Sequence, residues 1–174
     1  MITSTANAQV KNLAQLIKKS KARTEQGVYI VEGVKMFQEA PKDEIVKAYI
    51  SEELYEKGTL QDSLDGITYE VLKNEVFNHV ADTKTPQGVL CILKQKKYTL
   101  DQLTKGEAPL LLVLENLQDP GNLGTMMRTA EGAGVTGVLL SRGCVDIYNP
   151  KTIRSTMGSI YRVPFLYTDD LLGD

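Results

Sequence analysis

The densest group of residues that could do chemistry follows a run of aliphatic side chains in the second half of the sequence. Leu110–Leu114 is a run of five large aliphatic residues, which is typical of a strand buried on both faces. Asp119, Pro120 and Gly121 then predict a tight turn, because proline fixes φ and glycine tolerates positive φ. Ligands of open α/β sheets bind beyond the carboxyl ends of strands, so this turn is a candidate ligand site.

A helix is expected directly after this turn, over about residues 122–133, with Asn122 as its N-cap. A spacing of 100° per residue places these residues on its core side: Leu123, Met126, Met127, Ala130 and Ala133. Gly124, Arg128 and Glu131 fall on the opposite side. Arg128 is therefore expected on a solvent or cleft face, and Gly124, one turn earlier, would leave space there for a ligand. The spacing alone favours the plainer interpretation that Arg128 pairs with Glu131 at i+3.

Composition limits the function classes. The chain of 174 residues, with 42% hydrophobic and 24% charged side chains, has ordinary globular composition, which excludes collagen-like and disordered proteins. Its formal net charge of −2 does not indicate a nucleic-acid partner, but the charge is unevenly distributed. Residues 1–24 hold no acid and these basic residues: Lys11, Lys18, Lys19, Lys21 and Arg23.

Metal-binding and secreted classes are disfavoured by the cysteines and the single histidine. Cys91 and Cys144 form no CxxC pair, and His79 has no cysteine or second histidine near it in the sequence. Scattered cysteines are typical of a reducing compartment, and no stretch has the pattern of a signal peptide or a membrane span. We therefore expect a cytoplasmic protein without a metal site or a membrane partner.

The periodicity predicts alternating helices and strands. An amphipathic helix is expected over 8–19, with Asn7 as its cap. Strands are then expected at 28–31, 45–50, 67–71 and 87–93, and helices at 35–40, 52–57 and 75–81. This pattern favours an α/β domain over 1–95 with a largely parallel or mixed sheet. The polar, lysine-rich residues 96–107 are interpreted as a linker. A second α/β unit over 108–174 would add a strand at 138–140, a helix at 151–158 and a strand at 163–166.

The motif after the aliphatic run resembles a known family signature. The spacing of Asn116, Asp119, Pro120, Asn122, Gly124, Arg128, Thr129 and Ala130 is similar to the first motif of the SpoU (TrmH-type) RNA ribose methyltransferases, which belong to the SPOUT superfamily. Residues 146–159 resemble the segment that follows in that family, and residues 21–33 and 85–90 resemble its amino-terminal RNA-binding domain. The likeness covers essentially the whole chain.

This resemblance implies a fold and an activity. The fold would be an α/β/α sandwich that binds RNA, followed by the first half of an α/β knot methyltransferase domain. The activity would be methyl transfer from S-adenosylmethionine to a ribose 2′-hydroxyl of ribosomal or transfer RNA, by a homodimer. Arg128 would be the catalytic arginine and Asn122 the residue that supports it. Asn116, Asp119, Pro120 and Gly124 would maintain the motif.

The sequence also departs from the family pattern. The second and third family motifs have no counterpart here and are expected beyond Asp174, so we interpret the chain as a shortened form that binds S-adenosylmethionine weakly or not at all. Its cofactor-binding residues are unknown for the same reason. The RNA-binding candidates are Lys18, Lys19, Lys21, Arg23, Lys35 and Arg154. Charge alone allows a merely solvated helix face, and the alternative function is a non-catalytic RNA-binding module.

Overall fold

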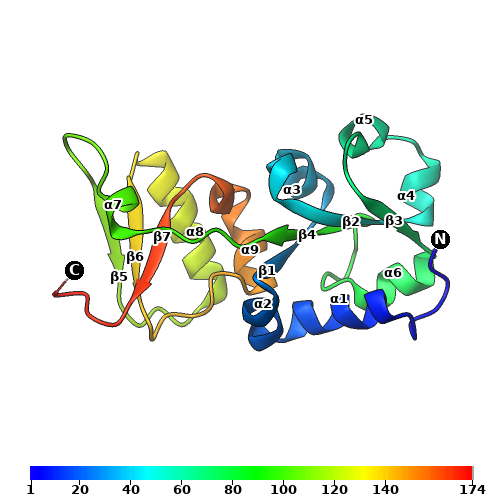
Figure 1. Ribbon diagram of the computed structural model, residues 1–174, viewed down its shortest axis with the longest axis horizontal. Helices are drawn as coiled ribbons and strands as arrows, with labels where there is room; N and C mark the ends of the chain where they lie inside the picture. Colours follow the sequence, from blue (N-terminus) through cyan, green and yellow to red (C-terminus); the bar gives the residue numbers. More distant parts are fainter. Residues whose placement is uncertain (174) are drawn as a thin grey trace. The chain divides into compact units, whose positions relative to one another are not determined.

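The structure, a computed structural model that describes residues 1–173, divides into two compact units, Met1–Gln95 and Lys96 onward (Figure 1). Each unit contains a β-sheet with helices packed against it, which confirms the expected α/β class. Among the described residues, no helix combines the length and the apolar character that crossing a bilayer requires.

The sheet of the first unit is mixed. Its strands are β1 (Val28–Glu32), β2 (Ile45–Ser51), β3 (Tyr69–Leu72) and β4 (Val89–Lys94), in the order β1-β4-β2-β3. β2 and β3 run parallel, whereas β4 runs antiparallel to both of its neighbours. Residues 89–93 of β4 are all buried, which fits their apolar sequence and the interior position of the strand.

Helices cover both faces of this sheet, as Figure 1 shows, with α1 and α6 on one side and α3, α4 and α5 on the other. The helices of this unit are α1 (Ala8–Lys18), α2 (Ser20–Gln26), α3 (Val34–Glu39), α4 (Glu52–Glu56), α5 (Gln61–Leu64) and α6 (Asn74–Val80). The expected cap of α1 is confirmed, because the side chain of Asn7 accepts a hydrogen bond of 2.8 Å from the backbone N–H of Gln9. Leu13, Leu16 and Phe77 join α1 and α6 to the buried core on their side of the sheet.

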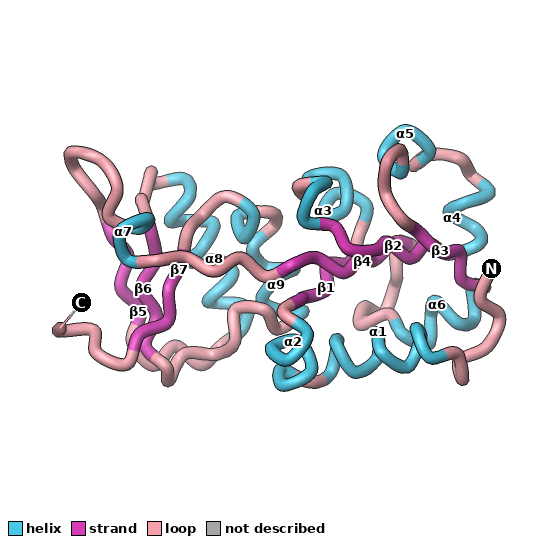
Figure 2. Tube along the Cα trace, in the orientation of Figure 1, coloured by secondary structure: helices cyan, strands magenta, loops and turns pink. Residues whose placement is uncertain are grey.

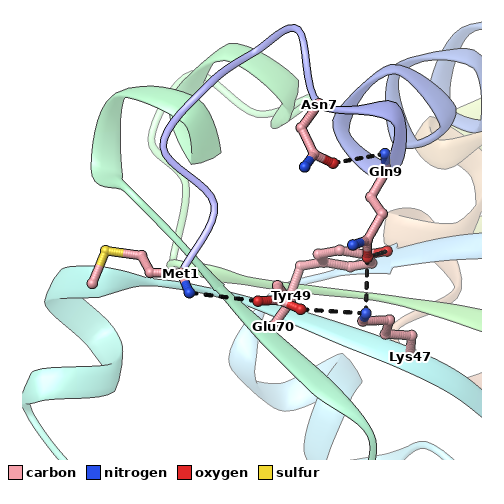
Figure 3. Close-up of polar contacts among 6 residues, drawn as sticks. All are labelled: Met1, Asn7, Gln9, Lys47, Tyr49 and Glu70. Atoms are coloured by element: carbon pink, nitrogen blue, oxygen red, sulfur yellow. Dashed lines mark hydrogen bonds and ion pairs between the residues drawn. The ribbon is translucent and has the colours of Figure 1, made fainter.

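A polar network ties the start of α1 to the sheet (Figure 3). The Gln9 Oε1 accepts hydrogen bonds from Lys47 Nζ at 2.8 Å and from the Tyr49 hydroxyl at 3.1 Å. Lys47 Nζ also lies 3.5 Å from a carboxylate oxygen of Glu70, whose other oxygen lies 3.6 Å from the amino group of Met1. Burial, with a smaller effect from Glu70, raises the pKa of Tyr49, so its hydroxyl remains protonated and can donate.

The second unit has a parallel sheet, and its strands lie side by side in Figure 2. Its strands are β5 (Leu111–Leu114), β6 (Gly137–Ser141) and β7 (Phe165–Thr168), in the order β5-β6-β7. Its helices are α7 (Leu100–Leu103), α8 (Pro120–Gly132) and α9 (Pro150–Thr156). Because parallel strands end at the same edge of a sheet, the loops that lead into α8 and α9 begin side by side.

The aliphatic run is not buried on both faces. β5 is an edge strand among the described residues, and the side chains of Leu110 and Val113 are 52% and 50% exposed. The expectation failed because a local run of apolar residues indicates a strand but not its place in the sheet.

Part of the lysine-rich segment at 96–107, which was expected to be a linker, packs against the second unit. Thr99 and Gln102 form a reciprocal capping box at the start of α7, and Leu103 is fully buried. A Cβ atom on Gly137 of β6 would lie 2.6 Å from Leu103 Cβ, so the absence of a side chain there admits α7.

Candidate functional site

The loop after β5 is held in an uncommon backbone conformation. Asn116 has φ of +51°, a value that asparagine tolerates better than most residues. Its backbone N–H donates a hydrogen bond of 2.9 Å to the hydroxyl of Ser141, at the end of β6. A Cβ atom on Gly143 would collide with the Asn116 side-chain oxygen, so the two loops approach as closely as a glycine allows.

Further bonds join the loop after β5 to the loop after β6. Leu117 accepts a backbone hydrogen bond of 2.8 Å from Val145 and donates one of 3.4 Å to the sulfur of Cys144. The side-chain amide of Gln118 donates to the carbonyl of Gly143. The two loops therefore form one hydrogen-bonded layer at the carboxyl end of the sheet.

Tyr167 of β7 connects the third strand to the same layer. Its hydroxyl donates a hydrogen bond of 2.6 Å to the carbonyl of Val145 and accepts one of 2.9 Å from the N–H of Ile147. Burial is the main cause that raises the pKa of Tyr167, so the hydroxyl keeps the proton that it donates.

Both helices that leave this layer start in the same way. Asp119 is the N-cap of α8, where its carboxylate accepts a hydrogen bond of 2.7 Å from the N–H of Asn122, and Pro120 is the first helical residue. Asn149 caps α9, where it accepts a hydrogen bond of 2.9 Å from the N–H of Lys151. The prediction that Asn122 caps α8 was therefore wrong. Proline is preorganised for the first helical position, so α8 begins at Pro120, two residues before Asn122. The exposed side chain of Asn122 therefore lies in the first turn of the helix.

The role expected of Gly124 was also wrong. Gly124 does not open space for a ligand but is buried between α8 and α9. A Cβ atom there would lie 2.7 Å from the carbonyl oxygen of Thr152 and 2.8 Å from the carbonyl carbon of Ser155, and it would collide with the Ser155 side chain. Two residues expected on the core side of α8, Met126 and Ala133, are exposed instead.

Arg128 is exposed, as predicted from its helical position, and it lines a shallow pocket of about 390 Å³. The ion pair with Glu131, the plainer interpretation, is not formed. The Glu131 carboxylate instead accepts hydrogen bonds from Nε and Nη2 of Arg162. Among residues 1–173, no ion pair engages the Arg128 guanidinium.

The pocket beside Arg128 is strongly cationic. It is lined by α8, α9 and the residue after α9, with these side chains: Thr125, Arg128, Lys151, Arg154, Ser155 and Met157. Three of them carry positive charge at neutral pH and no described lining residue is acidic, so the pocket suits an anion such as a phosphate. We call these six residues the cationic pocket.

Helical spacing could have identified the lining residues that the motif did not include. Thr125 precedes Arg128 by three residues on α8, and Arg154 and Ser155 follow Lys151 by three and four residues on α9. Residues at these separations share a helix face. Only the packing of α8 on α9, however, brings the two faces to one pocket.

The basic candidates of the first unit differ in exposure. Lys18, Lys19 and Lys21 are exposed, and Lys21 lies 3.7 Å from Glu25. Lys35 is exposed on α3, 3.8 Å from Glu39.

Arg23 was wrongly predicted as an RNA contact. Its side chain is only 3% exposed, and its guanidinium donates hydrogen bonds of 2.8 and 3.3 Å to the carbonyls of Leu16 and Ile17. It thus satisfies carbonyls in the last turn of α1, where a cation is favoured.

Comparisons with known proteins match each of the two units of the chain to a separate family. Residues 109–172 match the SpoU rRNA Methylase family, and residues 7–91 match the MRM3-like substrate binding domain. The 23S rRNA (guanosine(2553)-2′-O)-methyltransferase RlmP of Bacillus subtilis is 34% identical over 177 residues, which cover 98% of this chain and 68% of that protein. The mitochondrial rRNA methyltransferase 3 of Homo sapiens is 34% identical over 164 residues. The match covers 91% of this chain but only 39% of the human protein.

Solved structures show the same fold. An rRNA methyltransferase from Sinorhizobium meliloti, solved with AdoMet bound, superposes with a TM-score of 0.79 at 28% identity. The superposition covers 95% of this chain and 63% of that structure. An RNA 2′-O ribose methyltransferase superposes with a TM-score of 0.77 at 28% identity, over 97% of this chain and 66% of that structure. The chain belongs to the SpoU rRNA methylase family.

Proposed function

We propose that this protein acts in the transfer of a methyl group from S-adenosylmethionine to a ribose 2′-hydroxyl of ribosomal RNA. The observation that carries the proposal is the cationic pocket, where Arg128, Lys151 and Arg154 meet inside the segment that matches the SpoU family. The 2′-O activity in the name of the Bacillus subtilis relative, and the AdoMet in the Sinorhizobium meliloti structure, support the reaction and its methyl donor.

The proposed role of Arg128 follows from its charge. An arginine guanidinium offers five N–H donors and no acceptor, so Arg128 cannot serve as the proton acceptor for the ribose hydroxyl. It can donate two parallel hydrogen bonds to a phosphate and thereby orient the adjoining ribose. A fixed positive charge beside the 2′ oxygen also stabilises the negative charge that develops there as the proton leaves.

Asn122 is proposed to support Arg128 from the first turn of α8. Asn122, Thr125 and Arg128 follow each other at three-residue intervals, so they form a row along one side of the helix. The Asn122 side chain is exposed and makes no hydrogen bond among the described residues, which leaves its amide available to RNA.

The cationic pocket does not fit the methyl donor itself. S-adenosylmethionine carries a positively charged sulfonium, and the described lining of the pocket holds three cations and no carboxylate. We therefore assign this pocket to the RNA backbone. No residue described here is assigned to the cofactor, and among residues 1–173 no cluster of three or more metal-ligating side chains is found.

The exposed lysines of the first unit are proposed to contact RNA phosphates, namely Lys18, Lys19, Lys21 and Lys35. The match of residues 7–91 to a substrate binding domain supports this assignment. Arg154 is proposed to contact phosphate in the cationic pocket, and Lys151 joins it there.

Two further proposals concern the whole protein. We propose that it acts as a homodimer, as the family resemblance implies, and sedimentation at micromolar concentration tests this. We also propose a cytoplasmic location, which the Bacillus subtilis relative supports, whereas the vertebrate relatives carry mitochondrial names. Localisation of a tagged protein tests this.

The activity is tested by transfer of tritiated methyl groups from S-adenosylmethionine to unmodified ribosomal RNA, using the protein at its natural length. The modified nucleotide is located by alkaline hydrolysis, because a 2′-O-methyl group blocks cleavage at the adjacent phosphodiester. We expect Arg128→Ala to lower kcat by at least about 100-fold, as loss of one oxyanion-stabilising donor does. Arg142→Ala removes an exposed arginine that pairs with Asp169 outside the pocket, and should retain wild-type activity. Wild-type kcat in Arg128→Ala, or methylation on a base rather than a ribose, would refute the proposal.

A further inference from the structure

A second pocket lies in the first unit, where three strands end and one begins. Residue pairs Glu32–Leu90, Ile50–Val89 and Ser51–Leu72 place the ends of β1, β2 and β3 beside the start of β4. A pocket of about 420 Å³ opens at this edge, bounded by the starts of α3 and α6, by α4, and by the loop before β4. Its volume and its place at the carboxyl ends of strands are typical of small-ligand sites.

The lining of this pocket is rich in side-chain amides, so we call it the amide pocket. The Gln87 Oε1 accepts a hydrogen bond of 2.8 Å from the N–H of Val34, and the Asn74 Oδ1 accepts one of 3.0 Å from the N–H of Glu53. Each oxygen is therefore engaged, while each amide nitrogen remains as a donor. Asn78, one turn after Asn74 on α6, is exposed and makes no side-chain hydrogen bond among residues 1–173, so it offers both a donor and an acceptor.

The rest of the lining is apolar or charge-compensated. Val34 and Leu54, both partly exposed, contribute apolar surface, and Phe77 is fully buried beneath. The two charged lining residues, Glu53 and Lys57, pair with each other at 2.6 Å. The amide pocket therefore has no net charge, unlike the cationic pocket. It is suited to a neutral, partly apolar group with several hydrogen-bonding positions, and not to a phosphate.

The loop before β4 is fixed at both of its ends, so the amide pocket is already formed. The Glu32 carboxylate accepts hydrogen bonds from the N–H of Asp82, at 3.0 Å, and from the hydroxyl of Thr83. At the other end the carbonyl of Gly88 accepts a hydrogen bond of 2.8 Å from Ser51. A Cβ atom on Gly88 would lie 2.5 Å from the Ser51 hydroxyl oxygen. A preformed pocket binds its ligand without the cost of ordering the loop.

We propose that the amide pocket receives one unpaired nucleobase of the RNA substrate. The residues that line the amide pocket are distant in sequence from those of the cationic pocket. This inference rests on the proposed function, because it takes RNA as the substrate. Proteins that read RNA sequence bind unstacked bases of loops and bulges through hydrogen bonds to the base edges. The amides of Asn74, Asn78 and Gln87 provide such bonds, and exposed Lys73 and Lys84 lie close in sequence to lining residues. The pocket would therefore select the RNA, while the cationic pocket holds its backbone.

The test measures the affinity of the full chain for unmodified ribosomal RNA fragments, by fluorescence anisotropy over a range of salt concentrations. Asn78→Ala removes an amide that makes no side-chain hydrogen bond among the described residues, and Gln87→Glu keeps the acceptor for Val34 while it replaces the donor. We expect each variant to bind the preferred fragment about tenfold more weakly. The dependence on salt should be unchanged, because no phosphate contact is lost. Gln26→Ala is the matched control, since it removes an exposed amide of the same unit whose side-chain hydrogen bonds within residues 1–173 are to Asn12 alone.

A second measurement separates this inference from the proposed function. Crosslinking of RNA that carries 4-thiouridine, followed by mass spectrometry, should place a base on residues 74–78 or 86–88. That result would stand even if no methyl transfer were found. Both variants binding within twofold of Gln26→Ala, a reduced salt slope, or no RNA binding by the wild-type chain would overturn the inference. Binding of free nucleosides without any effect of the variants on RNA affinity would overturn it too.

Discussion

Replacing Gly124 by alanine should loosen the packing of α8 on α9, although alanine is the better helix former. The new methyl group would lie 2.7 Å from the backbone oxygen of Thr152 and 2.8 Å from the carbonyl carbon of Ser155. Both atoms belong to the backbone of α9, so no side-chain rotation can relieve the contact. The two helices must instead move apart, or α8 must turn about its axis.

The expected loss of stability combines two opposing effects. Overpacking in a tight contact costs about 1–3 kcal/mol. Removal of a glycine from a helix interior contributes about 1 kcal/mol in the opposite direction. Because the contacts are to backbone, we expect the upper part of the overpacking range, and a net loss of about 1–2 kcal/mol. Arg128 is one turn further along α8, so its guanidinium should also move relative to Arg154.

Gly132→Ala provides the matched control for this prediction. Gly132 is the last residue of α8, its φ is not positive, and an added Cβ would meet nothing within 4 Å. This variant should be more stable than the wild type by up to about 1 kcal/mol. Urea unfolding followed by circular dichroism, with hydrogen exchange of the α8 and α9 amides, reports both effects in the second unit. If Gly124→Ala were as stable as Gly132→Ala, the close contact between the helices would be refuted.

Two further predictions concern buried groups of the first unit. Arg23→Met should lower the free energy of unfolding by about 2 kcal/mol, because carbonyls at the end of α1 lose a charged donor. Arg23→Met should leave unchanged the slope of log RNA affinity against log salt concentration. Lys19→Met, at an exposed position, should reduce that slope by about one if Lys19 contacts a phosphate. A reduced slope in Arg23→Met would contradict the buried role of Arg23. Alkaline pH should destabilise the chain, because burial raises the pKa of the Cys91 thiol above its ordinary value of 9.0 and that of the Tyr49 hydroxyl above 10.0. At alkaline pH the unfolded chain releases protons that the folded chain retains, so the free energy of unfolding is unchanged below about pH 8 and falls as pH rises beyond 9. In Cys91→Ala this fall should begin at a higher pH. A free energy of unfolding by urea that stays constant to pH 11 would disprove this.

The elements that were predicted well carry local signals. α1 was predicted within one residue at its carboxyl end, because its apolar residues recur at helical spacing and Asn7 caps it. β4 was predicted from an unbroken apolar run between turn residues. α2 and α5 were not predicted, because neither short helix has a clear hydrophobic period. The exposure of β5 depends on which strands pair, and that information is not local.

The site was predicted in part, for a similar reason. The helical position of Arg128 was sufficient to place it on an exposed face, and the structure agrees. The same reasoning misplaced Gly124, because glycine has no side chain whose hydrophobicity could indicate a packing face, and only α9 reveals its role. Arg23 was misassigned because charge predicts exposure in most cases, whereas this guanidinium finds backbone acceptors in the interior.

The two helices that form the cationic pocket are held in place by backbone contacts. The arginines and lysine of the pocket come from these two helices, which begin in one hydrogen-bonded layer of loops and meet at a glycine. The nearest carboxylate along α8, that of Glu131, is bound by Arg162, so it does not neutralise Arg128. Like charges at one site repel each other, and an anion that enters relieves this repulsion. A polyanion such as RNA supplies that charge at no cost in protein rearrangement, because the helices are already in place. The pairing of Glu131 with Arg162 is therefore the feature that leaves the Arg128 guanidinium without this neighbouring countercharge.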